Sequence, residues 1–219
     1  MAKAVFAAAL LSLAGCSHRG GDIDRALAKA GNAAPRPEQF FICHSHGCTR
    51  KKRVSLKPEQ WARIRAIFQG TSGPEDERRR LRTAVAQLER WVGAQTGTDR
   101  DVGGSFQGFA RSGQLDCIDE MVNTATYIRL MERDRLLVHH RLDSHEYLGF
   151  FETGIWPHAA AAIRERGTER RFVVDSWWRD NGAPPYIVTY EEWWEGGWRE
   201  RYDAMDREAA GRVDADPAS

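Results

Sequence analysis

The chain has 219 residues, with 32 basic and 31 acidic side chains, so its formal net charge is only +1 at pH 7. A chain without excess positive charge has no general attraction to phosphate backbones, and we expect no nucleic-acid partner. Its length suits one domain with a sizeable core plus terminal segments.

The first sixteen residues have the pattern of an export signal. Lys3 precedes an apolar run over 4–13, which is too short for a permanent membrane-spanning helix. The triplet Leu13-Ala14-Gly15 is followed directly by Cys16, which resembles the cleavage site of a bacterial lipoprotein. The resemblance implies a lipid anchor on Cys16 and, because Ser17 is not acidic, an outer-membrane location facing the periplasm. An ordinary cleaved signal is the alternative.

Composition then changes along the chain. Residues 17–38 are rich in Gly, Ala and Pro, so we expect a flexible tether, followed by one domain over 39–204 and a disordered tail over 205–219. Apolar residues at helical spacing predict three helices, over 55–68, 75–94 and 117–133. Alternating patterns predict strands over 136–142, 146–152, 158–164, 171–177 and 186–189. This order favours an α+β fold in which N-terminal helices pack on a C-terminal antiparallel β-sheet.

The four cysteines divide into different roles. In an exported protein, the close pair Cys43 and Cys48 favours a small disulfide loop. The segment Cys43-His44-Ser45-His46-Gly47-Cys48 also contains good zinc ligands, but four ligands within six residues are too cramped to surround one ion. With Cys16 lipidated, Cys117 is the thiol left without a structural explanation.

Three residues have the chemistry of a thiol active site. Cys117 follows Asp116, a predicted helix N-cap, and the helix N-terminus favours a thiolate at that position. His158 and Asp175 lie in two predicted adjacent strands. They supply a base and a carboxylate that orients it. Asp116, Asp119 and Glu120 oppose the thiolate by their negative charge, so a nearby imidazolium is required.

The strands on either side of Gly167 predict how His158 and Asp175 meet. A two-residue turn at Arg166-Gly167 would pair Glu165 with Thr168 and place His158 directly opposite Asp175. Facing side chains in such a pair are about 5 Å apart. His139, His140 and His145 are the competing bases, and we interpret them as surface or core histidines.

These residues resemble the transglutaminase-like cysteine protease superfamily, and within it the bacterial transglutaminase-like cysteine proteinases. The resemblance covers about Gln114 to Asn181 and rests on Asp116-Cys117, His158-Ala159 and Val174-Asp175-Ser176-Trp177. It implies a papain-like core, with Cys117 as nucleophile, His158 as base and Asp175 as its orienting residue. Ile118 and Ala159 depart from the family pattern, because an aromatic residue often stands at each position.

The expected reaction is acyl transfer from an amide through a thioester. The backbone N–H of Cys117 is one expected oxyanion donor, and Gln107 or Gln114 is the second. The sequence predicts a membrane-tethered peptidase or amidase that acts on envelope peptides or proteins and needs no cofactor.

Two other functions stay open. One is a catalytically inactive member of the fold that binds a partner through its tryptophan-rich surface. The other is a metal-binding lipoprotein built on Cys43 to Cys48. The basic run Arg50-Lys51-Lys52-Arg53 either contacts anionic lipid or glycan or simply forms a solubilising surface.

Overall fold

The computed structural model describes residues 20–105, 112–149, 157–204 and 207. The predicted export signal with Cys16, the residue Gln107 and nearly all of the predicted tail lie outside these ranges. Among the helices of the described ranges, none combines the length and the apolar character that a membrane crossing needs.

The described helices and strands follow one another in groups: one helix, two strands, three helices, four strands and a final helix. The helices are α1 (Ile23–Lys29), α2 (Pro58–Ile67), α3 (Pro74–Thr96), α4 (Cys117–Arg133) and α6 (Tyr190–Glu195). The strands are β1 (Phe40–His44), β2 (Arg50–Val54), β3 (His140–Leu148), β4 (His158–Glu165), β5 (Arg171–Asp175) and β6 (Tyr186–Thr189).

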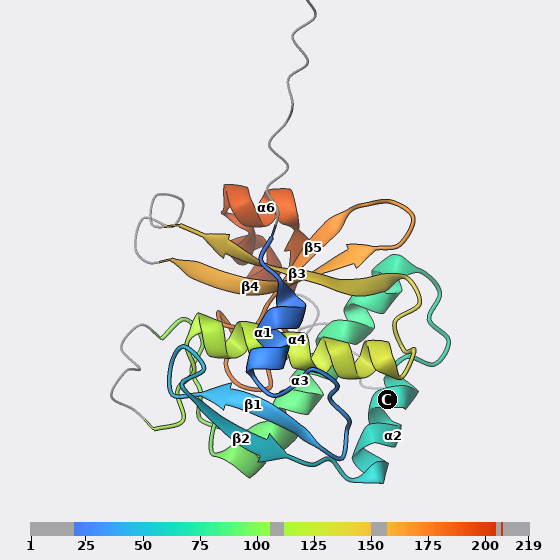
Figure 1. Cartoon of the computed structure of the whole chain (residues 1–219). Coiled ribbons are helices and arrows are strands. Elements are labelled where there is room, and N and C mark those ends of the chain that lie inside the picture. Colours follow the sequence, from blue (N-terminus) through green and yellow to red (C-terminus); the bar gives the residue numbers. More distant parts are fainter. Residues whose placement is uncertain (1–19, 106–111, 150–156, 205–206, 208–219) are drawn as a thin grey trace, which may run out of the picture.

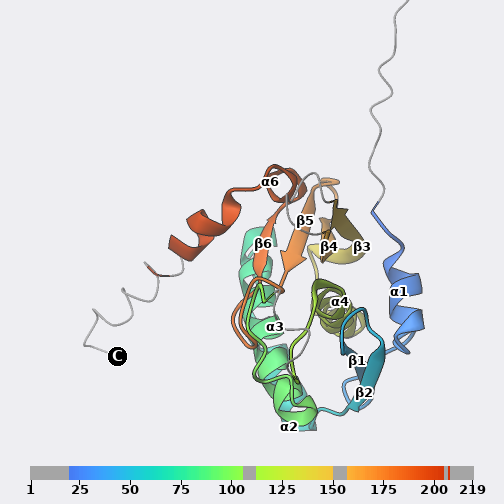
Figure 2. The ribbon, with the colours of Figure 1, turned by 90° about the vertical axis from the view of Figure 1, so that its left-hand side faces the viewer.

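The architecture is α+β with two antiparallel sheets. Strands β1 and β2 form a hairpin, and β3-β4-β5-β6 form a four-stranded meander. Helix α4 lies between the two sheets, with α3 on one side (Figures 1 and 2). The predicted order of N-terminal helices and a C-terminal sheet holds only in part: α2, α3 and α4 precede the large sheet, but β1 and β2 precede α2, and α6 follows the large sheet. The β1–β2 hairpin was not predicted, because the four basic residues that begin β2 show no alternation of apolar and polar side chains.

Two apolar cores cover the two faces of the large sheet. The inner core lies between the sheet and α4, where Ala159 and Ala161 of β4 allow the helix to approach closely. The outer core contains Val173 of β5 together with Trp193 and Trp198. Trp193 belongs to α6, which covers the outer face (Figure 2).

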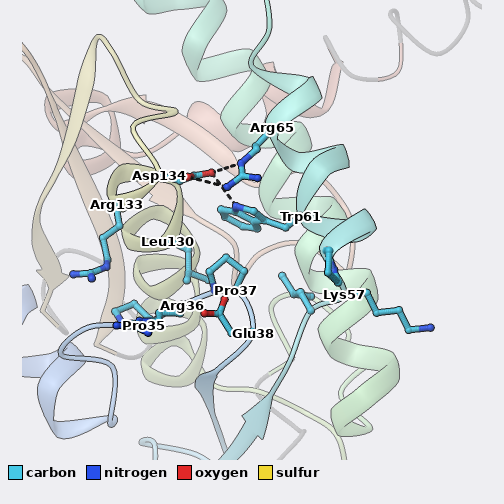
Figure 3. Close-up of a pocket in the computed structure, with 12 residues that line it drawn as sticks. Pro35, Arg36, Pro37, Glu38, Lys57, Trp61, Arg65, Leu130, Arg133 and Asp134 are labelled. Carbon is cyan, nitrogen blue, oxygen red and sulfur yellow. Dashed lines mark hydrogen bonds and ion pairs between the residues drawn. The ribbon is translucent and has the colours of Figure 1, made fainter.

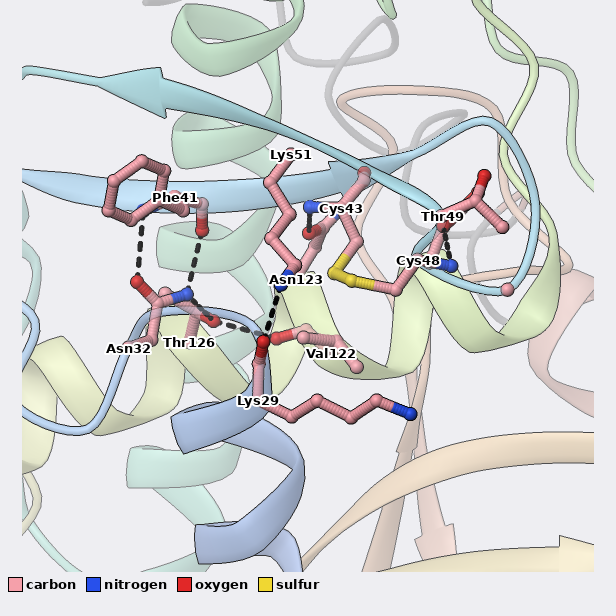
Figure 4. The surroundings of a disulfide bond; sticks show 12 residues. Lys29, Asn32, Phe41, Cys43, Cys48, Thr49, Lys51, Val122, Asn123 and Thr126 are labelled. Atoms are coloured by element: carbon pink, nitrogen blue, oxygen red, sulfur yellow. Dashed lines mark hydrogen bonds between the residues drawn. A yellow bond between two sulfur atoms is a disulfide. The ribbon is translucent and has the colours of Figure 1, made fainter.

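The segment predicted as a flexible tether contains a packed helix. In α1, the side chain of Asp22 caps the first turn, and Ile23 and Leu27 are buried. Asn32 then joins the segment to the rest of the fold: its Nδ2 donates to the carbonyl of Phe41 (2.7 Å) and to Oγ1 of Thr126 (2.9 Å) (Figure 4). The ordered domain therefore begins before residue 39. The helix was not predicted because its buried face contains only Ile23 and Leu27, which are too few to give a periodic pattern within a Gly-, Ala- and Pro-rich segment.

Two predicted strands, 136–142 and 146–152, overlap the single strand β3, and 150–152 lie outside the described residues. Its register with β4 shifts between Leu142 and Ser144, which is a β-bulge. Asp143 lies at this shift and forms a bidentate ion pair with Arg164 of β4, both contacts being 2.9 Å. The polar residues at 143–144 thus mark a bulge and not a turn.

Candidate functional site

The β4–β5 hairpin brings His158 and Asp175 together, but in a different register from the predicted one. Ala161 pairs with Val174, and the N–H of Glu165 donates to the carbonyl of Arg170. Four residues therefore form the turn, where two were expected. The change shifts the register by two residues, so His158 and Asp175 are diagonal neighbours. A shift of two keeps both side chains on the same face, because side chains alternate along a strand.

Asp175 holds the imidazole and is itself held by a tryptophan. Nε2 of His158 donates to Oδ2 of Asp175 at 2.7 Å, and Nε1 of Trp193 donates to the same oxygen at 2.8 Å. Asp175 is 1% exposed and His158 is 3% exposed. The carboxylate thus fixes the ring orientation from inside the fold.

Three tryptophans surround the His158 ring. Its centroid lies 5.0 Å from that of Trp177, 5.4 Å from Trp178 and 5.8 Å from Trp193. Burial lowers the pKa of His158, but attraction to Asp175, their hydrogen bond and the nearby Cys117 outweigh it and raise the pKa to about 9. His158 is therefore a cation at neutral pH.

Cys117 begins α4, as predicted, and is a free cysteine. Its Sγ lies 3.9 Å from the carbonyl oxygen of Pro157, the residue before His158, and its thiol is close enough to raise the pKa of His158. Nδ1 of His158 has no hydrogen-bond partner among the described residues, which leaves it free to exchange a proton. The structure thus places all three predicted residues at one end of the β4–β5 pair.

Backbone N–H groups bind two of the acidic residues around Cys117, Asp116 and Asp119. The predicted N-cap is present, since Oδ1 of Asp116 accepts from the N–H of Asp119 at 2.8 Å. Three successive N–H groups of the β1–β2 loop also bind these carboxylates: Gly47 donates to Asp116, whereas His46 and Cys48 donate to Asp119. The partial positive charges of these N–H groups therefore offset part of the negative charge that would oppose a thiolate.

A group of buried carboxyl groups lies beneath this end of α4. Burial raises the pKa of Glu89 to about 8, and it raises the pKa values of Asp101 and Asp119 to about 7. For Glu120, burial and the neighbouring Glu89, Asp101, Asp119 and Asp175 raise the pKa well above its usual range. Much of this group is therefore protonated at neutral pH and adds little negative charge near Cys117.

The disulfide Cys43–Cys48 that the sequence predicted is present and closes the β1–β2 loop. Asn123 of α4 secures the same strand, because its side chain accepts from the N–H of Cys43 (2.7 Å) and donates to its carbonyl (3.0 Å) (Figure 4). In this state, neither sulfur is a thiolate ligand for zinc. Within the described residues, no group of three or more Cys, His, Asp or Glu side chains is arranged to hold a metal ion.

The other predicted residues lie apart from the three. Oε1 of Gln114 accepts from the N–H of Val102, and its Nε2 donates to the carbonyl of Arg100 at 2.7 Å, so its side chain braces the 100–102 loop. His140 is buried, with Nδ1 2.9 Å from Oε1 of Glu77, and it pairs with Glu165 at the far end of β4 from His158. His145 packs against Tyr147.

A cavity of about 380 Å³ lies at the opposite end of α4 (Figure 3). Trp61 and Leu130 line it, and Asp134 accepts from Nε1 of Trp61 and from Arg65 at its edge. A helix of 17 residues is about 25 Å long, which separates this cavity from Cys117. It is not part of the same site.

Sequence reasoning missed two elements of the site. Trp193 is not among the residues predicted for the site, although Thr189 and Glu192 form a capping box that signals the short helix α6. Glu89 lies four residues after Val85 and eight after Leu81, on the buried face of α3. That spacing was the available signal for a buried acid.

Comparison with protein-family models, curated proteins and solved structures gave no match to this chain.

Proposed function

We propose that this chain is a thiol enzyme that cleaves or transfers an amide bond through Cys117, His158 and Asp175. The observation that carries the proposal is the buried His158–Asp175 pair next to a free thiol at a helix N-terminus. The same three residues support a proposed relationship to transglutaminase-like cysteine proteases and a papain-like core.

The chemistry begins with an ion pair. A protonated His158 beside the sulfur stabilises the thiolate of Cys117, which attacks the amide carbonyl and forms a C–S bond. His158 gives its proton to the leaving amine as the C–N bond breaks. Water or a second amine then attacks the thioester, loses a proton to His158 and releases the acyl group from Cys117.

The oxyanion that forms in each step needs hydrogen-bond donors. The N–H of Cys117 lies in the first turn of α4 and has no acceptor within the helix. It is the proposed first donor. Gln107 stays a proposal for the second, and Gln114 is the weaker choice because its amide is bonded to the 100–102 loop.

The proposed setting is the bacterial cell envelope, with a lipid on Cys16 as outer-membrane anchor and envelope peptides or proteins as substrates. This setting rests on the lipoprotein-like sequence that ends at Cys16 and on the disulfide, which suits an oxidising compartment.

A binding module without catalysis is the second candidate, and the burial of Cys117 favours it, because only 8% of this residue is exposed. Acylation by p-nitrophenyl acetate, an activated ester, separates the two functions. An enzyme forms an acetyl adduct on Cys117 that mass spectrometry detects, and His158→Ala slows its formation at least tenfold, about 1.4 kcal/mol in barrier. A folded protein that forms no adduct, or one whose rate ignores His158→Ala, would contradict catalysis.

A further inference from the structure

A second cavity, of about 480 Å³, lies between the β1–β2 loop and the end of α3. His44, His46 and Arg50 line it from the hairpin, and Thr96, Thr98 and Ser112 line it from the opposite side. Its size falls within the range of small-molecule sites. Gln114 also lines it, and apart from this weaker candidate for the second oxyanion donor, the mechanism proposed above uses none of its side chains.

The lining selects a polar ligand. Of the described residues that line this cavity, none carries a carboxylate or an all-hydrocarbon side chain. The lining consists of hydroxyl, imidazole, guanidinium and amide side chains and of glycine backbone. An apolar ligand would gain little by entering, whereas a hydroxylated ligand finds donors and acceptors on both walls.

The electrostatics select a negative ligand. Arg50 lies on one wall, and Nζ of Lys52 donates to the carbonyl of Thr96 on the other (3.3 Å). Burial lowers the pKa of His44, and the charges of Arg50 and Lys52 lower it further, so the cavity sits in a positive field. Nδ1 of His44 is 2.8 Å from Oγ of Ser45, and in the described part of the chain its Nε2 makes no hydrogen bond, which leaves it for a ligand.

The walls are held in place before any ligand arrives. The disulfide Cys43–Cys48 closes the loop that carries Ser45 and His46, and Asp119 binds the N–H groups of His46 and Cys48. On the other wall, a Cβ at Gly113 would lie 2.4 Å from the carbonyl oxygen of Gly97, so only glycine fits there. A fixed cavity reduces the entropy lost on binding.

We infer that this cavity binds an acidic carbohydrate, a hydroxylated ring of about monosaccharide size that carries a carboxylate or phosphate group. Arg50 and His44 receive the anionic group, and the hydroxyl of Ser112 faces the ring, whereas Oγ1 of Thr98 is 3.0 Å from Oγ1 of Thr96 and supports that wall. The inference does not depend on Cys117 and stands whether or not the chain is an enzyme.

The test is an NMR titration of the folded chain that follows the His44 ring with glucuronate, glucose 6-phosphate and neutral glucose. We expect saturable shifts with at least one acidic sugar and a higher His44 pKa in its presence, because a bound anion stabilises the imidazolium. Glucose should bind at least tenfold more weakly. Absence of a saturable shift with both acidic sugars, or equal binding of glucose, would overturn the inference.

Two variants and one further ligand sharpen the result. Arg50→Ala should weaken binding about tenfold, whereas Arg53→Ala, which removes the same charge from the same strand outside the cavity, should change it less than about twofold. Equal effects of the two variants would indicate general charge attraction and contradict a site. Inorganic phosphate that binds as tightly as glucose 6-phosphate would contradict a role for the hydroxylated ring.

Discussion

Nε2 of His158 lies 2.7 Å from Oδ2 of Asp175, although the two residues are not directly opposed in the β4–β5 ladder. Continuing the observed register places Asp175 opposite Ala160, two residues from His158. The hydrogen bond therefore joins diagonal neighbours, which are farther apart than directly opposed residues. Nε1 of Trp193 binds the same carboxylate and holds it in the required position.

The charge of Asp175 should control the protonation of His158. In Asp175→Asn the attraction and the hydrogen bond of the carboxylate are lost while burial remains, so the His158 pKa should fall from about 9 toward its usual range. Trp193→Phe keeps the carboxylate, so the pKa should stay above 6.5. NMR titration of the His158 ring measures both. A high pKa in Asp175→Asn would show that another group holds the proton.

Trp193 should act as a positioning residue. Trp193→Phe removes a buried donor and should lower the free energy of unfolding by about 1–3 kcal/mol, because Oδ2 of Asp175 loses a partner. It should also slow alkylation of Cys117 in the folded protein. Trp194→Phe, at the adjacent and more exposed position, is the matched control. Equal alkylation rates in the two variants would leave Trp193 with a purely structural role.

Stability should fall as pH rises from about 4.5 to 8. The pKa of Glu89 is raised to about 8, so the folded state binds more protons than the unfolded state across this interval. The folding free energy gained at low pH is lost as pH rises through the folded pKa. Glu89→Gln should reduce the slope seen by urea unfolding but not abolish it, because Asp101, Asp119 and Glu120 keep raised pKa values. Glu75→Gln, on the exposed face of the same helix, should retain the wild-type slope. Stability that increases over this interval would contradict protonated Glu89.

Residues 20–38 should be required for stability. Leu27→Ala should cost about 2–5 kcal/mol, because it leaves a cavity against the core. Arg25→Ala, on the exposed side of α1, should cost less than about 0.5 kcal/mol. Urea unfolding at fixed pH checks both. Equal stabilities would mean that this segment is the flexible tether that its composition suggested.

Reduction of the Cys43–Cys48 disulfide should destabilise the fold by about 2 kcal/mol, the loop-closure entropy of so short a loop. The measurement is urea unfolding with and without dithiothreitol in Cys117→Ala, which removes the free thiol found among the described residues. Reduction should also release the N–H groups that bind Asp116 and Asp119, and hydrogen exchange at Gly47 should then increase. Unchanged exchange at Gly47 would show that the hydrogen bonds from the loop to Asp116 and Asp119 do not depend on the disulfide.

Local patterns were sufficient for α2, α3 and α4, since each combines helical spacing with a proline or cap at its start. The face shared by His158 and Asp175 was also predictable, because alternation along a strand survives a register shift of two. The register itself was not, since a four-residue turn at 166–169 needs a left-handed backbone at Glu169 as well as at Gly167. Short elements such as α1 and α6 are stabilised by tertiary contacts, which no local pattern reports.

The loop whose N–H groups bind Asp116 and Asp119 lies about 70 residues away in the chain, so the sequence predicted the N-cap role of Asp116 but not these hydrogen bonds. The hydrogen bonds of both carboxylates depend on this distant loop, and the raised pKa of Asp119 depends on its burial in the fold.

Alkylation of Cys117 by iodoacetamide across pH, read by mass spectrometry in the folded protein, tests the central claim most directly. A thiolate paired with protonated His158 should react at pH 6, and His158→Ala should slow that reaction at least tenfold, about 1.4 kcal/mol in barrier, with circular dichroism confirming that the variant is folded. Identical pH profiles in the wild type and His158→Ala, or a Cys117 that reacts only after unfolding, would contradict a catalytic site.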